Sequence, residues 1–273
     1  MRHSQRNQRE IKLMAFDLSS IGATKHAYPP RILLHGNGGA GKSTFFSECN
    51  DSIFIQTENG LSGIEAQAFP LAKTYDDVMD QLRTLAKEDH DFKAVWIDSA
   101  DWLENLVHRK VCQDHNVKTI ELAAGGYGKG YLEAMNLWRG VLTALDWLRE
   151  NKSMFTGFTC HSQIQHVDDP EHEGGYDRYS LKLHNSKKGI GSLSTIYEWA
   201  DVVGFLKVVY QLGDQEIARG DVKKMKNVTQ ARQLCLEEHA AYQAKNRFGL
   251  TPQIEIIKGE GWSSFLAELT NAQ

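Results

Sequence analysis

Short apolar runs recur along the first part of the chain, and longer segments with helical periodicity separate them. The runs lie at residues 31–36, 52–57, 93–99 and 154–160. Apolar runs of about four to eight residues with polar borders are typical of buried strands. Strands that alternate with helices are typical of a parallel sheet covered on both faces. The pattern therefore predicts an α/β fold with a mostly parallel central sheet flanked by helices.

The intervening segments predict the helices that cover this sheet. Residues 75–87, 101–115 and 130–151 each carry apolar side chains three and four positions apart. This spacing places the apolar side chains on one face of an amphipathic helix. Packing in the core explains the Trp and Met residues of the third segment better than a cofactor site does.

The second part of the chain is less regular. Residues 165–192 are polar and contain several glycines, which predicts a long loop of the kind that is usually functional. A short helix near 195–200, a strand at 202–210 and hairpin-like segments towards Ile257 follow. We therefore expect a β-rich C-terminal part.

These patterns divide the chain into three parts. Residues 1–29 are polar and end at a Pro-Pro pair, which disfavours helix on both sides. They are interpreted as an N-terminal arm. The sheet and its helices predict one domain over 30–260, and residues 261–273 are interpreted as a C-terminal tail.

Composition excludes several classes of protein. The 273 residues are 41% hydrophobic and 24% charged, as in soluble globular proteins. Lysine and arginine number 31 against 35 aspartate and glutamate, which gives a formal net charge of −4. This balance excludes a globally basic nucleic-acid coat but allows a local basic patch. Because no apolar run reaches the ~18 residues of a membrane span and the start is too polar for a signal peptide, we expect a cytoplasmic protein without a membrane partner.

The clearest motif is GNGGAGKS, which lies between a predicted strand and a predicted helix. It matches G-x-x-x-x-G-K-[ST], in which backbone N–H groups surround a phosphate, the lysine reaches the β- and γ-phosphates and the hydroxyl binds Mg²⁺. We expect ATP and Mg²⁺ as cofactors. The predicted nucleotide-binding residues are Gly36, Asn37, Gly38, Gly39, Ala40, Gly41, Lys42, Ser43 and Thr44.

Two acidic residues follow neighbouring strands. Asp98 ends the run Val-Trp-Ile-Asp and is predicted to hold Mg²⁺ together with Ser43, although it could also cap the next helix. Glu58 follows the second strand and is the candidate that orients or deprotonates the attacking water. The alternative for Glu58 is a solvated loop position. Glu104 is the second candidate, and we expect it to point away along a helix.

The phosphate loop at 36–43, Glu58 after the second strand, Asp98 at the end of the third and residues 161–163 after the fourth follow one another in this order. In this order the chain resembles the RecA-like ATPases. The resemblance implies that Glu58 is the catalytic base and that Gln163 senses the γ-phosphate and couples it to a DNA-binding loop. The element Lys-Asn-Arg-Phe-Gly at 245–249 is similar to the Lys-x-Arg element of bacterial RadA and DnaB-type ATPases. There it implies that Lys245 and Arg247 reach the nucleotide of a neighbouring subunit. The alternative is a basic β-turn.

The likeness extends over about 31–257 to phage-encoded RecA-core ATPases associated with single-strand annealing and recombination. It implies an ATPase that binds single-stranded DNA, self-associates with nucleotide at the subunit interface and works in the cytoplasm of a bacterial host. A single-strand-binding protein is a further partner that it suggests. Two alternatives stay open: a ring-forming DNA motor of the helicase type, and a small-molecule P-loop kinase.

Two segments, residues 125–131 and the long stretch after Gln163, occupy the places of the DNA-binding loops of RecA. Both combine glycines with aromatic side chains, which can stack on bases, and with cations, which can neutralise phosphates. The alternative is a pair of solvated loops whose tyrosines pack on the core. The candidate DNA-binding residues are Tyr127, Lys129, Tyr131, Tyr176, Arg178, Tyr179, Lys182, Lys187 and Lys188.

Overall fold

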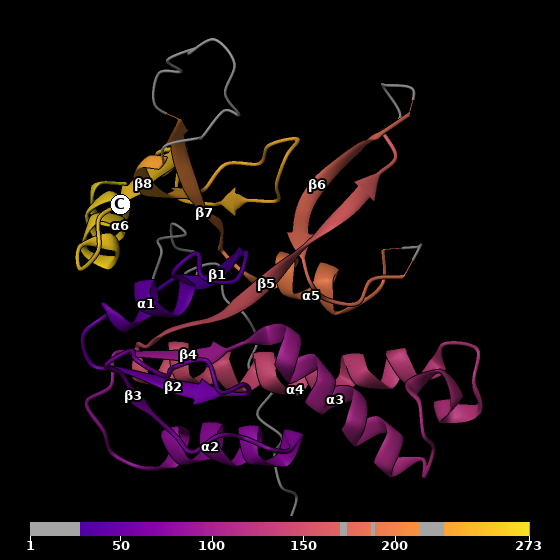
Figure 1. Cartoon of the computed structure of the whole chain (residues 1–273). Helices are drawn as coiled ribbons and strands as arrows, with labels where there is room; N and C mark the ends of the chain where they lie inside the picture. The colour runs from indigo at the N-terminus through magenta and orange to yellow at the C-terminus, as the bar shows by residue number, and fades with distance from the viewer. Residues whose placement is uncertain (1–27, 170–173, 187–188, 213–226, 273) are drawn as a thin grey trace, which may run out of the picture.

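The computed structural model describes residues 28–169, 174–186, 189–212 and 227–272 (Figure 1). The strands are β1 (Arg31–Gly36), β2 (Ser52–Gln56), β3 (Gln67–Ala68), β4 (Ala94–Asp98), β5 (Phe155–Val167), β6 (Tyr176–Leu181), β7 (Val202–Leu212), β8 (Asn227–Cys235), β9 (Lys245–Asn246) and β10 (Gln253–Ile256). The helices are α1 (Lys42–Ser47), α2 (Tyr75–Lys87), α3 (Ala100–Asp114), α4 (Lys129–Lys152), α5 (Ser192–Trp199) and α6 (Gly261–Asn271), with a 3-10 segment η2 (Ile120–Gly125).

The central sheet has the order β10-β8-β7-β1-β5-β4-β2-β3. The strands from β7 to β3 in this order pair in parallel, whereas β8 and β10 are antiparallel. The predicted α/β class with a mostly parallel sheet and a β-rich C-terminal part is therefore confirmed. Because β1 is central, the segment that follows it lies in the middle of the carboxyl edge, where open α/β sheets bind ligands.

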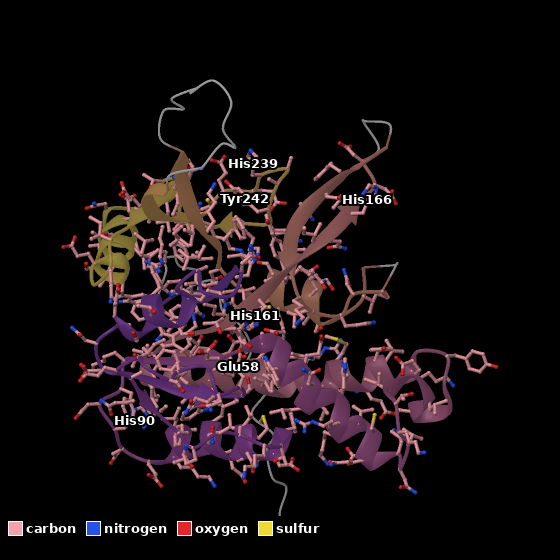
Figure 2. The ribbon with its side chains drawn as sticks, in the orientation of Figure 1. Glu58, His90, His161, His166, His239 and Tyr242 are labelled. Atoms are coloured by element: carbon pink, nitrogen blue, oxygen red, sulfur yellow. The ribbon has the colours of Figure 1, made fainter. Side chains whose placement is uncertain are left out.

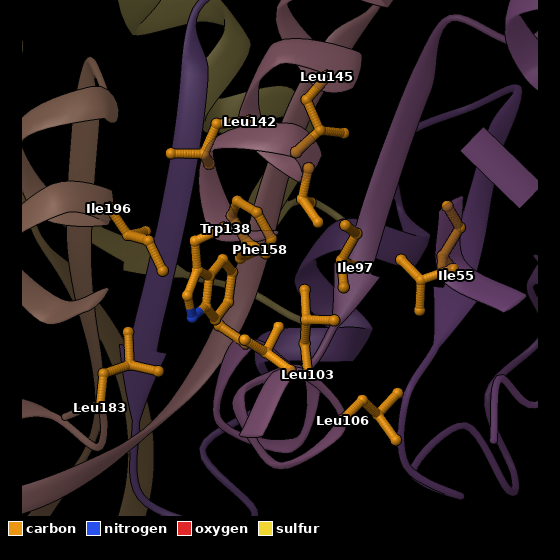
Figure 3. Packing of buried hydrophobic residues seen from close by; sticks show 14 of the residues in the cluster. Ile55, Ile97, Leu103, Leu106, Trp138, Leu142, Leu145, Phe158, Leu183 and Ile196 are labelled. Atoms are coloured by element: carbon orange, nitrogen blue, oxygen red, sulfur yellow. The ribbon is translucent and has the colours of Figure 1, made fainter. Parts of the chain in front are cut away.

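Each face of the sheet has its own hydrophobic core. Strand β1 shows the division, because Leu33 packs with α2, α3 and α4 whereas Ile32 and Leu34 pack with α1 and α6. Figure 3 shows the larger core, in which Trp138 of α4 lies against Phe158 of β5. The three helices predicted from periodicity supply this core, as expected for apolar stripes that face a buried sheet.

The prediction of one long loop over 165–192 is wrong. Strand β5 continues to Val167 and pairs with β6 as an antiparallel ribbon, with Ser162 opposite Leu181 and Val167 opposite Tyr176. Figure 1 shows this ribbon extending away from the central sheet. Its outer positions are solvated on both faces, so they lack the apolar alternation that marks a half-buried strand.

The structure describes the C-terminal segment but almost none of the N-terminal arm. Residues 261–271, interpreted above as part of a tail, form α6, and its Trp262, Phe265 and Leu269 are buried in the core with α1. The arm at 1–29 lies almost entirely outside the described residues, which begin at Tyr28. Within the described residues, no helix combines the length and apolar character that a membrane span requires.

Candidate functional site

The phosphate loop joins β1 to α1 at the carboxyl edge of the sheet. Gly39 and Gly41 have φ values of 77° and 104°, in the left-handed region that favours glycine. The Lys42 ammonium group donates hydrogen bonds to the carbonyl oxygens of Gly36 (3.0 Å) and Asn37 (3.2 Å). Lys42 is buried, and burial lowers the pKa of its ammonium group. The loop therefore holds the lysine close to the backbone that would surround a phosphate.

Asp98 and Ser43, the two predicted magnesium ligands, are brought together. The Ser43 hydroxyl donates to Asp98 Oδ2 at 2.7 Å, and the Thr159 hydroxyl donates to the other carboxylate oxygen. Among the described residues no three His, Cys, Asp or Glu side chains form a metal cluster. A hydroxyl and one carboxylate fit Mg²⁺, which usually binds one or two carboxylates and takes its other ligands from phosphate and water.

Glu58, the candidate that acts on the attacking water, lies beside these two residues. Its Oε1 accepts a 2.6 Å hydrogen bond from the Ser99 hydroxyl, and Ser99 follows Asp98 directly. The adjacency follows from the register, because Gln56 of β2 is paired with Asp98 of β4. Burial raises the pKa of the Glu58 carboxyl, although Ser99 and His161 oppose the shift. A carboxylate with a raised pKa is suited to accept a proton from water.

The second candidate, Glu104, is not part of this site. It is buried on α3, where its carboxylate accepts hydrogen bonds from the backbone N–H of His184 (2.9 Å) and from the Ser192 hydroxyl. Burial raises the pKa of Glu104 to about 7. Glu104 therefore bonds to both ends of the segment between β6 and α5, and among the described residues it forms no hydrogen bond with the phosphate loop.

Gln163 lies on β5, two residues beyond His161, which is paired with Gly36 at the start of the phosphate loop. Its side chain is exposed, and its Nε2 donates to the Leu181 carbonyl oxygen at 3.2 Å. His161, two positions earlier, lies beside Glu58 (Figure 2). Its Nδ1 is 3.0 Å from Asp101 Oδ2 and 3.9 Å from Glu58 Oε1.

Sequence reasoning missed the pair formed by His161 and Asp101. A sequence signal exists for each residue. His161 lies two residues after Thr159 and therefore on the same face of the strand. Asp101 lies on the first turn of the helix that follows Asp98. The hydrogen bond to Asp101 raises the pKa of His161. For Asp101, burial opposes the charged form, but hydrogen bonds from His161 lower its pKa.

We expect Asp101→Asn to lower the pKa of His161, because the bond to the carboxylate is the main cause that raises it. A raised folded-state pKa gives stability that is present below the unfolded value of about 6.5 and is lost as pH rises through the folded value. The loss of unfolding free energy caused by Asp101→Asn should therefore be larger at about pH 6 than at about pH 9. NMR titration of His161 and denaturant unfolding at the two pH values would measure both effects. An unchanged titration midpoint would contradict the assignment.

The two predicted fingers, Lys245 and Arg247, lie at the opposite edge of the sheet from the phosphate loop. Lys245 is paired with Val203 near the start of β7, and the start of β7 lies beside the start of β1. The phosphate loop follows the other end of β1. These cations are therefore not placed to contact the nucleotide of their own subunit.

Both fingers have intramolecular partners. The Lys245 ammonium group donates to the Tyr197 carbonyl oxygen and lies over the Tyr197 ring. Burial, with the nearby Arg247 charge, lowers the pKa of Lys245 to about 8. Arg247 forms a 3.2 Å ion pair with Asp201, yet half of its side chain is exposed.

The candidate DNA-binding residues fall into two groups. Those with intramolecular partners are Tyr131, stacked on His184 with centroids 3.9 Å apart, Tyr179, stacked on Phe205, and Arg178, paired with Glu238 at 2.6 Å. Those that are exposed are Tyr127, Lys129 and Lys182. Tyr176 is half-buried on β6, whereas Lys187 and Lys188 lie outside the described residues.

Tyr127 is the most accessible of these side chains. It is 100% exposed and lies between η2 and α4, in the segment that connects the end of α3 to the start of α4. Figure 1 shows this turn well beyond the strands of the sheet. The stack of Tyr131 on His184 connects the start of α4 to the segment that follows β6. The structure thus brings the two predicted DNA-binding segments into contact.

Comparison with known proteins places this site in a family. Residues 28–248 match the family model AAA_24, described as an AAA domain. No curated protein matches the chain. Among solved structures, the crystal structure of the RadB recombinase is similar with 14% sequence identity and a TM-score of 0.45, over 86% of this chain and 90% of that chain. The family match includes the phosphate loop, Glu58, Asp98 and the Lys-x-Arg element, and the chain therefore belongs to the AAA_24 family of P-loop ATPase domains.

Proposed function

We propose that this protein hydrolyses ATP with Mg²⁺, binds single-stranded DNA and promotes annealing or recombination. One observation carries the hydrolytic part. Two hydrogen-bonded pairs, Ser43 with Asp98 and Ser99 with Glu58, lie side by side at the phosphate loop because Ser99 directly follows Asp98. These pairs hold a carboxylate with a raised pKa close to two magnesium ligands. Such an arrangement suits attack of water on a phosphate more than simple nucleotide storage.

The proposed mechanism divides the work among these residues. Lys42 and the loop N–H groups would bind the β- and γ-phosphates, while the Ser43 hydroxyl and Asp98 would hold Mg²⁺. Bound Mg²⁺ would neutralise charge on the phosphate oxygens. Glu58 orients the attacking water and accepts its proton. His161, held by Asp101, places its imidazole Nδ1 3.9 Å from the Glu58 carboxylate and helps to fix its position.

We also propose that Lys245 and Arg247 act on the nucleotide of a neighbouring subunit. Two observations support this. Both lie at the edge of the sheet opposite to their own phosphate loop, and half of the Arg247 side chain is exposed. A cation supplied in trans stabilises the charge that develops on the transferred phosphoryl group. The protein would then be active only as an oligomer.

The proposed DNA surface is centred on the turn before α4. Tyr127 offers a fully exposed ring and Lys129 an exposed cation. Base stacking on an aromatic ring tolerates any sequence, and phosphate contacts make binding sensitive to salt. The intramolecular partners of Tyr131, Arg178 and Tyr179 give these residues a supporting role. A single-strand-binding protein remains a proposed partner.

We expect Tyr127→Ala to weaken binding of single-stranded DNA about tenfold or more, since stacking contributes ~1–3 kcal/mol per base. Lys129→Ala should weaken binding less and reduce its salt dependence by about one phosphate contact. Fluorescence anisotropy with a labelled oligonucleotide at several salt concentrations measures both effects. Lys258→Ala removes an exposed lysine near α6 and is the matched control. Parent-like binding by both loop variants would refute the DNA surface.

A further inference from the structure

Arg232, on β8, lies against the outside of the phosphate loop. Its Nε donates a 3.0 Å hydrogen bond to the carbonyl oxygen of Ala40. A Cβ atom built on Gly41 would lie 3.2 Å from Nε and 4.0 Å from Cζ of this arginine. The guanidinium group therefore covers the loop at the position before Lys42. Two features disfavour a side chain at position 41. The backbone is left-handed there, and Arg232 occupies the space beside the position of a Cβ atom.

The fold explains how so distant a residue reaches the loop. Side chains two positions apart share a face of a strand. Leu234 of β8 is buried in the same core cluster as Phe45 of α1. Arg232 extends that face by one step towards the start of α1. It is held between Val208 of β7 and Ile256 of β10, its paired neighbours in the sheet.

The charge of Arg232 has no carboxylate partner among the described residues. Other arginines near the sheet are paired, Arg31 and Arg247 with Asp201 and Arg178 with Glu238. Within the described part of the chain, Arg232 uses only its Nε as a hydrogen-bond donor. Its terminal amino groups are thus available to an anion, and the planar guanidinium fork suits a phosphate group.

The order of the sheet sets the side from which Arg232 approaches. Strands β7 and β8 lie on one side of β1, whereas β5, β4 and β2 lie on the other. The hydrolytic groups Glu58 and Asp98 follow β2 and β4. Arg232 therefore faces the phosphate loop from the side opposite to the groups that act on water and magnesium.

We propose that Arg232 is a nucleotide-positioning residue that binds, within its own subunit, the phosphates that ATP and ADP share. This inference rests on the proposed binding of nucleotide at the loop. Arg232 would contact these phosphates equally in the ground state and in the transition state. The contact therefore contributes to nucleotide affinity and not to the rate at saturation. It differs in this respect from Glu58, Lys245 and Arg247.

The test compares two variants that separate the charge of Arg232 from its bond to the loop. Arg232→Gln keeps an N–H donor for the Ala40 carbonyl but removes the charge, and Arg232→Lys keeps the charge. Isothermal titration calorimetry with Mg-ADP, and with Mg-ATP in the Glu58→Gln background, gives the affinities. Arg139→Gln is the matched control, because Arg139 is exposed on α4 and bonds only to Asn136 among the described residues.

We expect Arg232→Gln to bind both nucleotides about tenfold more weakly, the scale of one lost charge-assisted hydrogen bond. Its kcat should stay within about twofold of the parent value while its KM rises, and Arg232→Lys should recover most of the affinity. Parent-like affinity in Arg232→Gln would show that the arginine only braces the loop. Equal losses in the Gln and Lys variants with a lowered melting temperature would show a purely structural role.

Either of these results overturns the inference and leaves the proposed function intact. Failure of the parent protein to bind Mg-ADP would overturn both. The Lys42→Ala variant separates the two cases, because it should lose binding wherever the parent binds, whatever the result for Arg232.

Discussion

Replacing Glu58 with glutamine is expected to reduce ATP hydrolysis by about two orders of magnitude or more, which is the scale of general base catalysis. Glutamine keeps the size of the side chain and can still bond to the Ser99 hydroxyl, but it cannot accept a proton from water. Nucleotide binding should persist, because Glu58 acts only as the reaction proceeds. Phosphate release and calorimetric titration with Mg-ATP separate the two effects.

The matched variant is Lys42→Ala, which should weaken nucleotide binding itself, since the lysine contacts phosphate in the ground state. Parent-like turnover in Glu58→Gln would refute its assignment as the base. Glu104 is a poor replacement, because its carboxylate is occupied by His184 and Ser192. His161 would then be the next residue to replace, since its imidazole can accept a proton and its Nδ1 lies 3.9 Å from the Glu58 carboxylate.

Arg247→Ala is expected to lower ATP turnover by about 10³-fold, the scale seen when an arginine finger is removed. Binding of nucleotide to the same subunit should be unchanged, because Arg247 lies at the other edge of the sheet. Mixing Arg247→Ala with Lys42→Ala subunits should restore part of the parent rate. A mixed interface can then combine an intact phosphate loop with an intact finger.

Folding must be checked in this experiment, because Arg247 is paired with Asp201. Asp201 keeps its bond to Arg31 at 2.8 Å in the variant, so we expect circular dichroism and the melting temperature to change little. A monomer with full activity, or folded variants that co-assemble without recovering activity, would contradict action in trans.

The sequence was most informative where structure depends on local pattern. Apart from β3 and the outer end of β5, the strands and helices of the first part are predicted within a few residues, because apolar runs and helical stripes report burial directly. The positions of Glu58 and Asp98 could also be predicted, since both follow strands that end at one edge of a parallel sheet. In the structure the register of β2 and β4 brings the two positions side by side.

The remaining features depend on contacts between distant segments. The outer positions of the ribbon of β5 and β6 are exposed or half-buried on both faces, so no apolar alternation distinguishes them from a loop. The bond between Arg232 and Ala40 joins residues 192 positions apart, and neither residue type indicates such a contact. Likewise, Tyr131 and Tyr179 carry the aromatic character expected of a DNA-binding loop, yet stacking on His184 and Phe205 occupies them.

The account is tested most directly by the rate of phosphate release from Mg-ATP, measured with the parent protein alone and with single-stranded DNA, duplex DNA or RNA. We expect a low basal rate that single-stranded DNA raises several-fold, with loss of the stimulated rate in Glu58→Gln and loss of the stimulation in Tyr127→Ala. Stimulation by duplex DNA instead would favour a motor. A rate that no polymer changes would contradict the DNA-dependent function and favour a P-loop enzyme with a small-molecule acceptor.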